Sequence, residues 1–358
     1  MNRPVIVGPV EGGSARVDTR IDDAGVWFES ADGALDTSAE AAGSAVLLPA
    51  VRRRRRLRII GQPVSAEWRT NVVRLMEVWR EWWGYPVLEP HVDVRAEVRP
   101  RADGTVLCFT GGLDSFYSLL RGERLPDALA FVQGYDIPLG DRVRQAAWDA
   151  ALTRVAAATG TRAIRLRSNV RTHPLVARSQ WDRAHGGALA AIGHLLSSAA
   201  GTLVIASSAP VRYGYAWGSH ESTDRFWSSD RLVVVHHGAS KSRIEKLQAI
   251  GGERLVQQHL RVCWENRVPA GNCSTCDKCV STMVMIAACA DPSRFDTFDW
   301  SVPVERRLDR LRSTRFVRTY GELLHLPLPA TLATAIQSLL RRNLLPGRVR
   351  ALWHDWRG

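Results

Sequence analysis

Apolar runs alternate with longer amphipathic stretches from residue 104 onward, and this alternation constrains the fold more than any other feature of the chain. Such a pattern is typical of βα units, which build a mostly parallel sheet covered by helices on both faces. The expected strands span residues 105–109, 128–132, 163–166, 203–206 and 232–235. The expected helices span residues 114–121, 141–158, 185–198 and 240–250. The sequence therefore predicts an α/β protein.

The segments before and after this region differ from it in pattern. Residues 15–20 and 25–29 read as short strands between turn-forming residues, and residues 65–83 have the period of a helix with Ser65 as N-cap. We expect a small β-rich lobe with one helix, a main α/β domain, a four-cysteine segment with a helix at about 277–289, and a basic helical tail. Their expected bounds are 1–95, 96–260, 261–290 and 291–358.

Composition narrows the choice of partners. No stretch approaches the roughly 18 consecutive apolar residues of a membrane span, and the first residues lack a secretory signal, so we expect a cytoplasmic protein with reduced cysteines. The net charge of +12 would suit nucleic acid. However, only three of the 48 basic residues are lysines, and an arginine excess with abundant alanine is typical of a GC-rich genome. Nucleic acid is therefore a secondary alternative.

A glycine-rich turn joins the first main-domain strand, which ends at Phe109, to the following helix. The turn reads Thr110-Gly111-Gly112-Leu113-Asp114-Ser115. Two glycines let the backbone approach an anion closely, and the N–H groups and dipole at a helix start favour phosphate. An acid such as Asp114 fits beside phosphate when Mg²⁺ lies between them. The turn therefore predicts a metal-assisted pyrophosphate site, with an ordinary glycine turn as the structural alternative.

Two common nucleotide motifs do not fit this turn. The chain has no Gly-Lys pair, which a Walker loop requires, and the third glycine of a dinucleotide fingerprint is missing. The turn instead resembles the SGGxDS signature of the PP-loop ATP pyrophosphatases, with Thr110 in place of the first serine. This resemblance implies a Rossmann-like fold of the adenine nucleotide alpha hydrolase type. It also implies that ATP adenylates a substrate oxygen and releases pyrophosphate, after which a nucleophile displaces AMP.

Four cysteines form a second motif, with spacing C-x9-C-x2-C-x2-C at Cys263, Cys273, Cys276 and Cys279. Four thiolates complete a tetrahedral zinc site, so the metal is expected to be structural. An iron–sulfur cluster is the alternative. The other two cysteines, Cys108 and Cys289, are expected to be small core residues, with a reactive sulfur at Cys108 as the alternative.

Over about residues 104–290, the turn followed by the cysteine motif resembles the 7-cyano-7-deazaguanine synthase (QueC) family. The resemblance implies Zn²⁺ on the four cysteines and ATP along Phe109 to Leu119, with Asp136 after the second strand near the adenine. It implies that 7-carboxy-7-deazaguanine is adenylated and reacts with ammonia, giving an amide and then a nitrile. Residues 185–188 match the family's substrate side loosely.

Further polar residues are candidates for the site. Lysines are rare in this chain, so a compact ammonium from Lys241 or Lys246 suits a phosphate or acyl adenylate. The predicted catalytic set is therefore Asp114, Ser115 and Lys241, and the predicted nucleotide contacts are residues 109–115 and Asp136. Polar side chains also crowd the segment after the fourth strand, where they are expected to contact substrate: Ser219, His220, Glu221, Asp224 and Asp230.

Three functions follow from these features. The first is an adenylating ligase that joins a carboxylate of deazapurine type to ammonia or an amine; relatives in anti-phage defence systems suggest a protein amine as acceptor, which the additional amino-terminal lobe would suit. The second is a sulfurtransferase acting on tRNA, which needs a reactive Cys108 or Cys289. The third is an ATP-binding protein without turnover.

Overall fold

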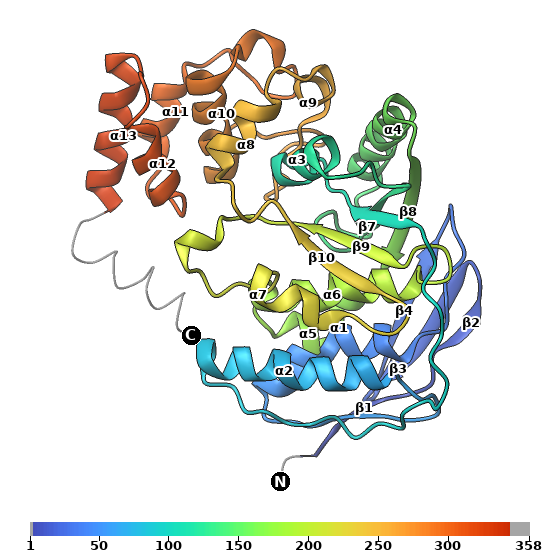
Figure 1. The fold of residues 1–358 in the computed structure, drawn as a ribbon. Coiled ribbons are helices and arrows are strands. Elements are labelled where there is room, and N and C mark those ends of the chain that lie inside the picture. The colour runs from blue at the N-terminus through green and yellow to red at the C-terminus, as the bar shows by residue number, and fades with distance from the viewer. Residues whose placement is uncertain (1–2, 344–358) are drawn as a thin grey trace.

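A ten-stranded mixed sheet runs through the computed structural model, which describes residues 3–343 (Figure 1). Five neighbouring strands are parallel, in the order β10-β9-β6-β7-β8. Their bounds are Val233–His237, Thr202–Ala206, Thr105–Cys108, Ala128–Gln133 and Arg162–Ser168. All five strands expected from the apolar runs are present, which confirms the α/β class and the mostly parallel central sheet.

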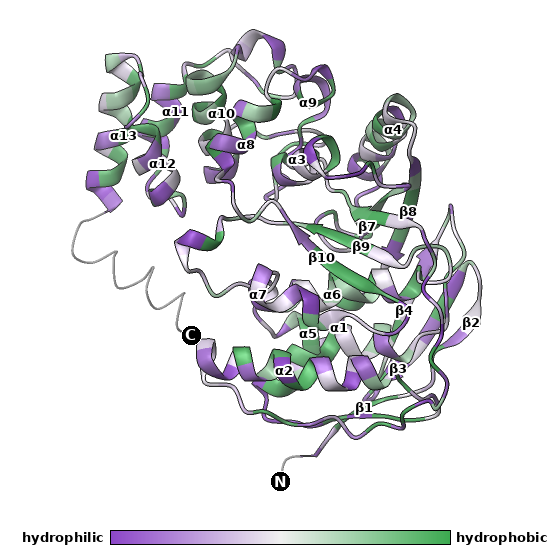
Figure 2. Cartoon of the chain, viewed as in Figure 1, coloured by the Kyte–Doolittle hydropathy of each residue, from purple (hydrophilic) through white to green (hydrophobic). Residues whose placement is uncertain are grey.

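Side chains alternate between the two faces of this sheet. Val106 and Cys108 of β6 belong to one apolar core, whereas Leu107 and the following Phe109 belong to the other. Because both faces are covered, β7 is buried along its whole length and its sequence is continuously apolar until Gln133. Figure 2 shows β7 and β9 as mainly hydrophobic, whereas a helix such as α2 alternates between hydrophobic and hydrophilic residues.

Helices cover both faces of the sheet, as the sequence predicts (Figure 1). The first core takes its helical side chains mainly from three helices: α1 (Ala39–Arg52), α2 (Ala66–Trp83) and α6 (Trp181–Leu195). The second core takes them from eight helices: α3 (Leu113–Arg121), α4 (Arg142–Thr159), α8 (Arg243–Ile250), α9 (Arg254–His259), α10 (Asp277–Cys289), α11 (Val304–Arg310), α12 (Val317–Leu323) and α13 (Ala330–Asn343). Ser65 caps α2 by accepting a hydrogen bond from the Trp68 N–H, as expected.

The amino-terminal strands continue the central sheet. Strand β4 pairs antiparallel with β8, with Phe28 opposite Ser168, and the order then runs β4-β3-β1-β5, with β2 beside β3. The bounds of β1 to β5 are Val5–Val7, Glu11–Gly13, Arg16–Ile21, Ala24–Ser30 and Leu57–Ile59. Strands expected at 15–20 and 25–29 are therefore present, and they share a core with the parallel strands.

The remaining elements are short helices and a carboxy-terminal helical group. The short helices include α5 (Pro174–Ala177), α7 (Glu221–Asp224) and the single 3₁₀ turns at 170–172, 211–213, 225–227 and 292–294. The carboxy-terminal group comprises α11 (Val304–Arg310), α12 (Val317–Leu323) and α13 (Ala330–Asn343). The expected helical tail is thus present to residue 343, and its last part, 344–358, lies outside the described residues. None of the helices within 3–343 is long and apolar enough to cross a membrane.

Candidate nucleotide site and metal centre

The glycine turn lies at the carboxyl end of β6 and opens α3, the place where open α/β sheets bind ligands. Gly111 has φ +70°, and a Cβ there would lie 2.2 Å from the Trp148 ring. Gly112 is the N-cap of α3 and makes no side-chain cap, whereas Ser242 caps α8 and Asp141 caps α4. The first N–H groups of α3 are therefore left for an anion.

The predicted nucleotide contacts differ in their accessibility. Thr110, Gly112 and Asp114 are partly exposed, whereas Phe109, Gly111, Leu113 and Ser115 are buried. The Ser115 hydroxyl donates to the carbonyl of Gly112 (3.0 Å), and the Thr110 hydroxyl accepts from the Gly112 N–H (3.3 Å). These two bonds hold the turn, so a ligand meets chiefly the Thr110, Gly112 and Asp114 side of it.

Asp114 lies between two cations of α8. Its Oδ1 accepts from Lys246 Nζ at 3.0 Å, and its Oδ2 contacts Arg243 Nη2 at 3.1 Å. Burial alone would raise the pKa of the Asp114 carboxyl, but the charges of Lys246 and Arg243 outweigh it and lower this pKa to about 2. Because one carboxylate faces two cations beside an uncapped helix start, the cluster suits a bound polyanion.

Lys241 and Lys246 occupy different environments. The Lys241 side chain is 47% exposed and lies 3.6 Å from Glu245, away from Asp114, whereas the Lys246 side chain is 1% exposed. The sequence contained a signal for this difference: the Ser242-x-x-Glu245 capping box starts α8 at Arg243. Arg243 and Lys246 are then three residues apart and share one helix face.

Asp136 follows β7 and is partly exposed, and its backbone carbonyl accepts from Asn266 Nδ2 at 3.1 Å. Lys278, from the cysteine segment, interacts electrostatically with both Asp136 and Asp114. Burial and the nearby Arg243 lower the pKa of Lys278, and the two carboxylates oppose that shift. Lys278, Arg243 and Lys246 are the charged residues at this site that the sequence-based set omitted.

Arg261 joins the glycine turn to the cysteine segment. Its backbone N–H donates to the Gly111 carbonyl at 2.8 Å. Its side chain is 8% exposed and lies over the Trp148 ring, and Nε and Nη2 make no hydrogen bond within residues 3–343. Burial lowers the pKa of this guanidinium, whereas Asp136 raises it. A buried, unsatisfied guanidinium beside the turn adds positive potential to the site.

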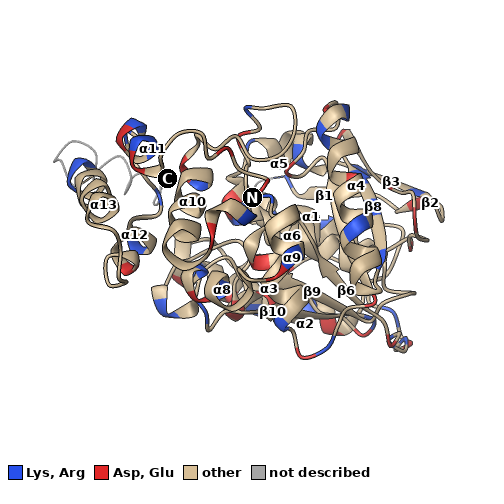
Figure 3. Cartoon of the chain, turned by 90° about the horizontal axis from the view of Figure 1, so that it is seen from above, with Lys and Arg blue, Asp and Glu red and all other residues tan. Residues whose placement is uncertain are grey.

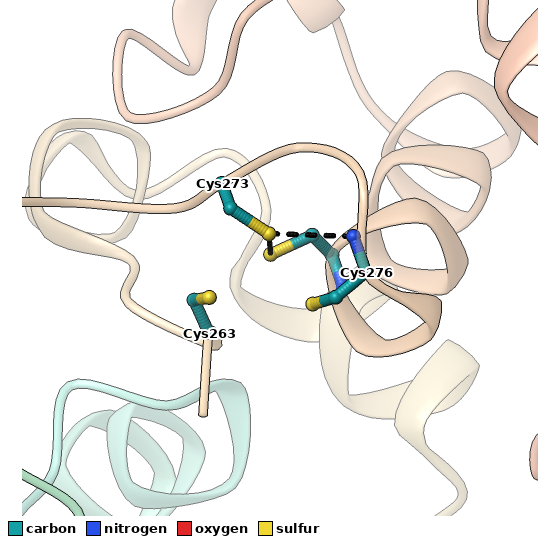
Figure 4. Close-up of side chains that lie close together, drawn as sticks. Cys263, Cys273 and Cys276 are labelled. Carbon is teal, nitrogen blue, oxygen red and sulfur yellow. Dashed lines mark hydrogen bonds between the residues drawn. The ribbon is translucent and has the colours of Figure 1, made fainter. Parts of the chain in front are cut away.

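The four predicted metal ligands lie together. The sulfur atoms of Cys263, Cys273, Cys276 and Cys279 are all within 4.8 Å of one another, and Figure 4 shows three of them directed toward a common centre. A Zn–S distance of about 2.3 Å in a tetrahedron requires sulfur atoms roughly 3.8 Å apart. The Sγ atoms of Cys273 and Cys279 are 3.8 Å apart. All four cysteines are free and buried, so the group can hold a metal ion such as zinc.

Backbone and amide hydrogen bonds hold the cysteine segment in shape. The N–H groups of Cys276 and Cys279 donate to the sulfurs of Cys273 and Cys276, at 3.3 and 3.5 Å. Asn272 accepts from the Cys263 N–H through Oδ1 (3.1 Å) and donates to the Leu260 carbonyl through Nδ2 (2.8 Å). The two halves of the segment are therefore fixed to each other, directly beside Arg261.

The polar residues after β9 divide into two groups. Ser219 Oγ donates to Asp224 Oδ2 at 2.6 Å, and His236 Nδ1 contacts the same oxygen at 2.8 Å. Asp230 instead pairs with Arg95 at 2.5 Å, on the side of the amino-terminal strands. His185 is partly buried in α6, where its Nδ1 contacts the Trp181 carbonyl. Only part of the predicted substrate-side set is therefore brought together.

Charges on the face seen from above the site are mixed. Figure 3 shows acidic and basic segments interspersed around α3, α8 and α10, without one continuous basic tract. Comparisons with protein-family models, with curated proteins and with solved structures find no match to this chain.

Proposed function

We propose that the protein is an ATP-dependent adenylating enzyme of PP-loop type that activates a carboxylate, of the 7-carboxy-7-deazaguanine type, and transfers it to ammonia or an amine. One observation carries this proposal: the cluster of Asp114, Lys246 and Arg243 at the uncapped start of α3. Catalysis of phosphoryl and nucleotidyl transfer depends mainly on positioning and charge neutralisation, which such a cluster supplies.

In the proposed reaction, a carboxylate oxygen attacks the α-phosphorus of ATP. The bond from that phosphorus to the bridging oxygen breaks, so pyrophosphate leaves and an acyl adenylate forms. Ammonia or an amine then attacks the acyl carbon, loses a proton and expels AMP, which gives an amide. The N–H groups of the turn and the charges of Lys246 and Arg243 bind and orient the departing pyrophosphate. A protein amine as acceptor belongs to this same proposal. So does the nitrile, which forms only from the amide made with ammonia: the amide oxygen attacks the α-phosphorus of a second ATP, pyrophosphate leaves, and loss of AMP with that oxygen and of the N–H protons gives the nitrile.

Mg²⁺ is part of the proposal, with Asp114 as its protein ligand. In the structure both Asp114 oxygens contact α8 cations. Phosphate oxygens would compete for Lys246 and Arg243 and release a carboxylate oxygen for the ion, which keeps its other ligands from phosphate and water. Mg²⁺ supplies charge neutralisation on the phosphates when bound.

The sulfurtransferase alternative needs a reactive thiol outside the metal centre. Burial raises the pKa of the Cys108 thiol to about 12, and burial also raises the pKa of Cys289. Since the thiolate is the nucleophile, both cysteines are poorly suited to carry sulfur. These observations favour the ligase over sulfur transfer.

The test is carboxylate-dependent exchange of labelled pyrophosphate into ATP, together with mass spectrometry of the products formed from 7-carboxy-7-deazaguanine, with and without ammonia. We expect Asp114→Ala and Lys246→Met each to reduce exchange by about a hundredfold or more. Lys241→Met is the matched control and should remain within about twofold of the unmodified protein.

Folding of each variant is checked by its metal content and thermal unfolding. Full AMP production by Asp114→Ala would show that the assigned turn is not the nucleotide site. Tight ATP binding with no AMP formed from any carboxylate and amine would favour the non-catalytic alternative, and mass spectrometry would separate nitrile, amide and protein adduct.

A further inference from the structure

A cleft of about 810 Å³ opens beside the candidate nucleotide site. It lies between the loop after β7, the start of α6, the cysteine segment and the loop after α11. Asp136 lines its end nearest the glycine turn, whereas Trp181 and Trp264 line its walls. This volume falls within the range of about 300–1,000 Å³ that is typical of small-molecule sites. The proposed nucleotide contacts other than Asp136 do not line this cleft.

The two tryptophans in the cleft carry cationic neighbours. Trp264 is 40% exposed, with Lys278 Nζ 5.1 Å and Arg315 Cζ 5.7 Å from its ring centroid. Arg171 Cζ lies 4.8 Å from the centroid of Trp181. An aromatic ring flanked by cations offers a stacking surface for a planar group together with positive potential for an anion.

The charges lining the cleft are mixed, and cations lie beside its aromatic rings. Its walls hold five arginines and four acidic residues. Two of those acids lie close to lining arginines, since Arg267 pairs with Glu265 and Arg315 lies 4.0 Å from Asp182. Lys278 adds a further positive charge beside Trp264 and makes no ion pair with another described residue. Lys278 and Arg315 thus place positive charge directly beside the Trp264 ring.

Lys278 also connects the cleft to the nucleotide site. It lies within electrostatic range of Asp114 of the turn and of Asp136 at the cleft end. A carboxylate held near Lys278 would therefore be at the junction of the two sites. In-line attack on a bound α-phosphate requires such a juxtaposition.

We propose that this cleft binds the acid that is adenylated, a planar aromatic carboxylate, with its ring against Trp264 and its carboxylate toward Lys278. That the bound acid is then adenylated rests on the proposed function, whereas its binding to the cleft requires no ATP. Lys278 is in this view a substrate-binding residue within the cysteine segment. The metal centre would then shape the acyl-substrate site as well as the fold.

The test is calorimetric titration of the metal-loaded full chain without nucleotide. The probes are 7-carboxy-7-deazaguanine and indole-3-carboxylate, with 7-cyano-7-deazaguanine and indole-3-carboxamide as their uncharged counterparts. We expect at least one carboxylate to bind, and to bind better than its uncharged counterpart. Trp264→Ala and Lys278→Met should each weaken the binding of that carboxylate about tenfold or more, whereas Trp264→Phe should retain most of the affinity.

The control for loss of a positive charge is Arg124→Ala, at an exposed arginine outside the cleft, and metal content confirms that the cysteine segment is intact. ATP affinity is measured on Trp264→Ala, which alters no residue of the candidate nucleotide site, and should change by less than about twofold. A parallel loss of ATP affinity would make the cleft part of the nucleotide site and overturn the inference. The proposed binding site would also be refuted if neither carboxylate bound, or if Trp264→Ala and Lys278→Met left the carboxylate affinity unchanged. Loss of AMP formation with carboxylate binding intact would instead refute only the proposed reaction.

Discussion

At the scale of single residues, the buried His194 in α6 makes stability depend on pH. Its Nε2 contacts the Trp227 carbonyl at 3.0 Å, and Glu40, Arg95 and Asp230 lie within electrostatic range. Burial lowers the pKa of His194 to about 4, against the opposing effects of Glu40 and of the Trp227 hydrogen bond. The imidazole is therefore neutral in the folded protein at neutral pH.

The sign of the effect follows from the lowered pKa. Between about pH 6.5 and pH 4 the unfolded chain binds a proton at this position that the folded chain does not, so stability present above pH 6.5 is lost as the pH falls. The loss amounts to about 3 kcal/mol for a shift of this size. His194→Gln should remove this part of the slope in urea unfolding measured across that range, and the exposed His325 provides the control variant. Equal slopes for His194→Gln and the unmodified protein would contradict the assignment.

At the scale of elements, the close contact of α1 with α6 depends on glycine. A Cβ at Gly187 would lie 2.2 Å from the Ser44 carbonyl oxygen of α1 and 3.0 Å from the Trp227 ring. We expect Gly187→Ala to destabilise the fold by about 1–3 kcal/mol, because the clash outweighs the better helix propensity of alanine. Gly321 in α12 has open space around it, so Gly321→Ala should be neutral or stabilising by up to about 1 kcal/mol. Urea unfolding of both variants measures the difference.

Helices α1 and α6 illustrate which elements can be predicted from sequence patterns, because α6 was expected and α1 was not. Strands β6 to β10 and helices α2, α3, α4, α6, α8 and α10 were all expected, because each has an apolar run or one apolar face. Helix α1 was missed, because residues 39–51 are all buried and the segment therefore has no polar face and no helical period. Pro49 and Gly43 within the helix also have low helix propensity, so the sequence argues against a helix there. Residues Gly186 and Gly187, which matched a substrate-side motif loosely, lie in the packed interface of α6.

At the scale of the whole molecule, sequence motifs predicted single segments of the candidate site, but not which residues from distant segments lie together there. The glycine turn and the four-cysteine group were predicted from short motifs. The four sulfurs lie together, and Asp114 of the turn contacts two cations. The predicted set named Lys241 and not Lys246, although the Ser242-x-x-Glu245 capping box already places Lys246 within α8 on the face of Arg243; the exposure of Lys241 and the contact of Lys246 with Asp114 are seen only in the folded chain. Lys278 and Arg261 come from a segment more than 140 residues after the turn, so no local pattern relates them to it.

Hydrogen bonds also link the four-cysteine group to the glycine turn. Arg261 lies two residues before Cys263, and its N–H donates to the Gly111 carbonyl. Asn272 fixes the same extended segment, residues 260–263, to the second half of the cysteine segment. A metal bound by all four sulfurs thus stabilises the position of Arg261 and of the turn. We expect metal removal by a chelator to lower the free energy of unfolding by several kcal/mol and to weaken ATP binding.

Metal analysis, thermal unfolding and ATP titration of the metal-loaded and metal-free protein measure this coupling. Cys276→Ser should reproduce both losses, whereas Cys289→Ser, outside the four-sulfur group, should cause neither. Unchanged ATP affinity in a folded, metal-free protein would mean that the turn keeps its shape without the cysteine segment. Weakened affinity would mean that the distant sulfurs help to set the backbone of the turn formed by residues 110–115, since the hydrogen bond from the Arg261 N–H to the Gly111 carbonyl joins the two parts.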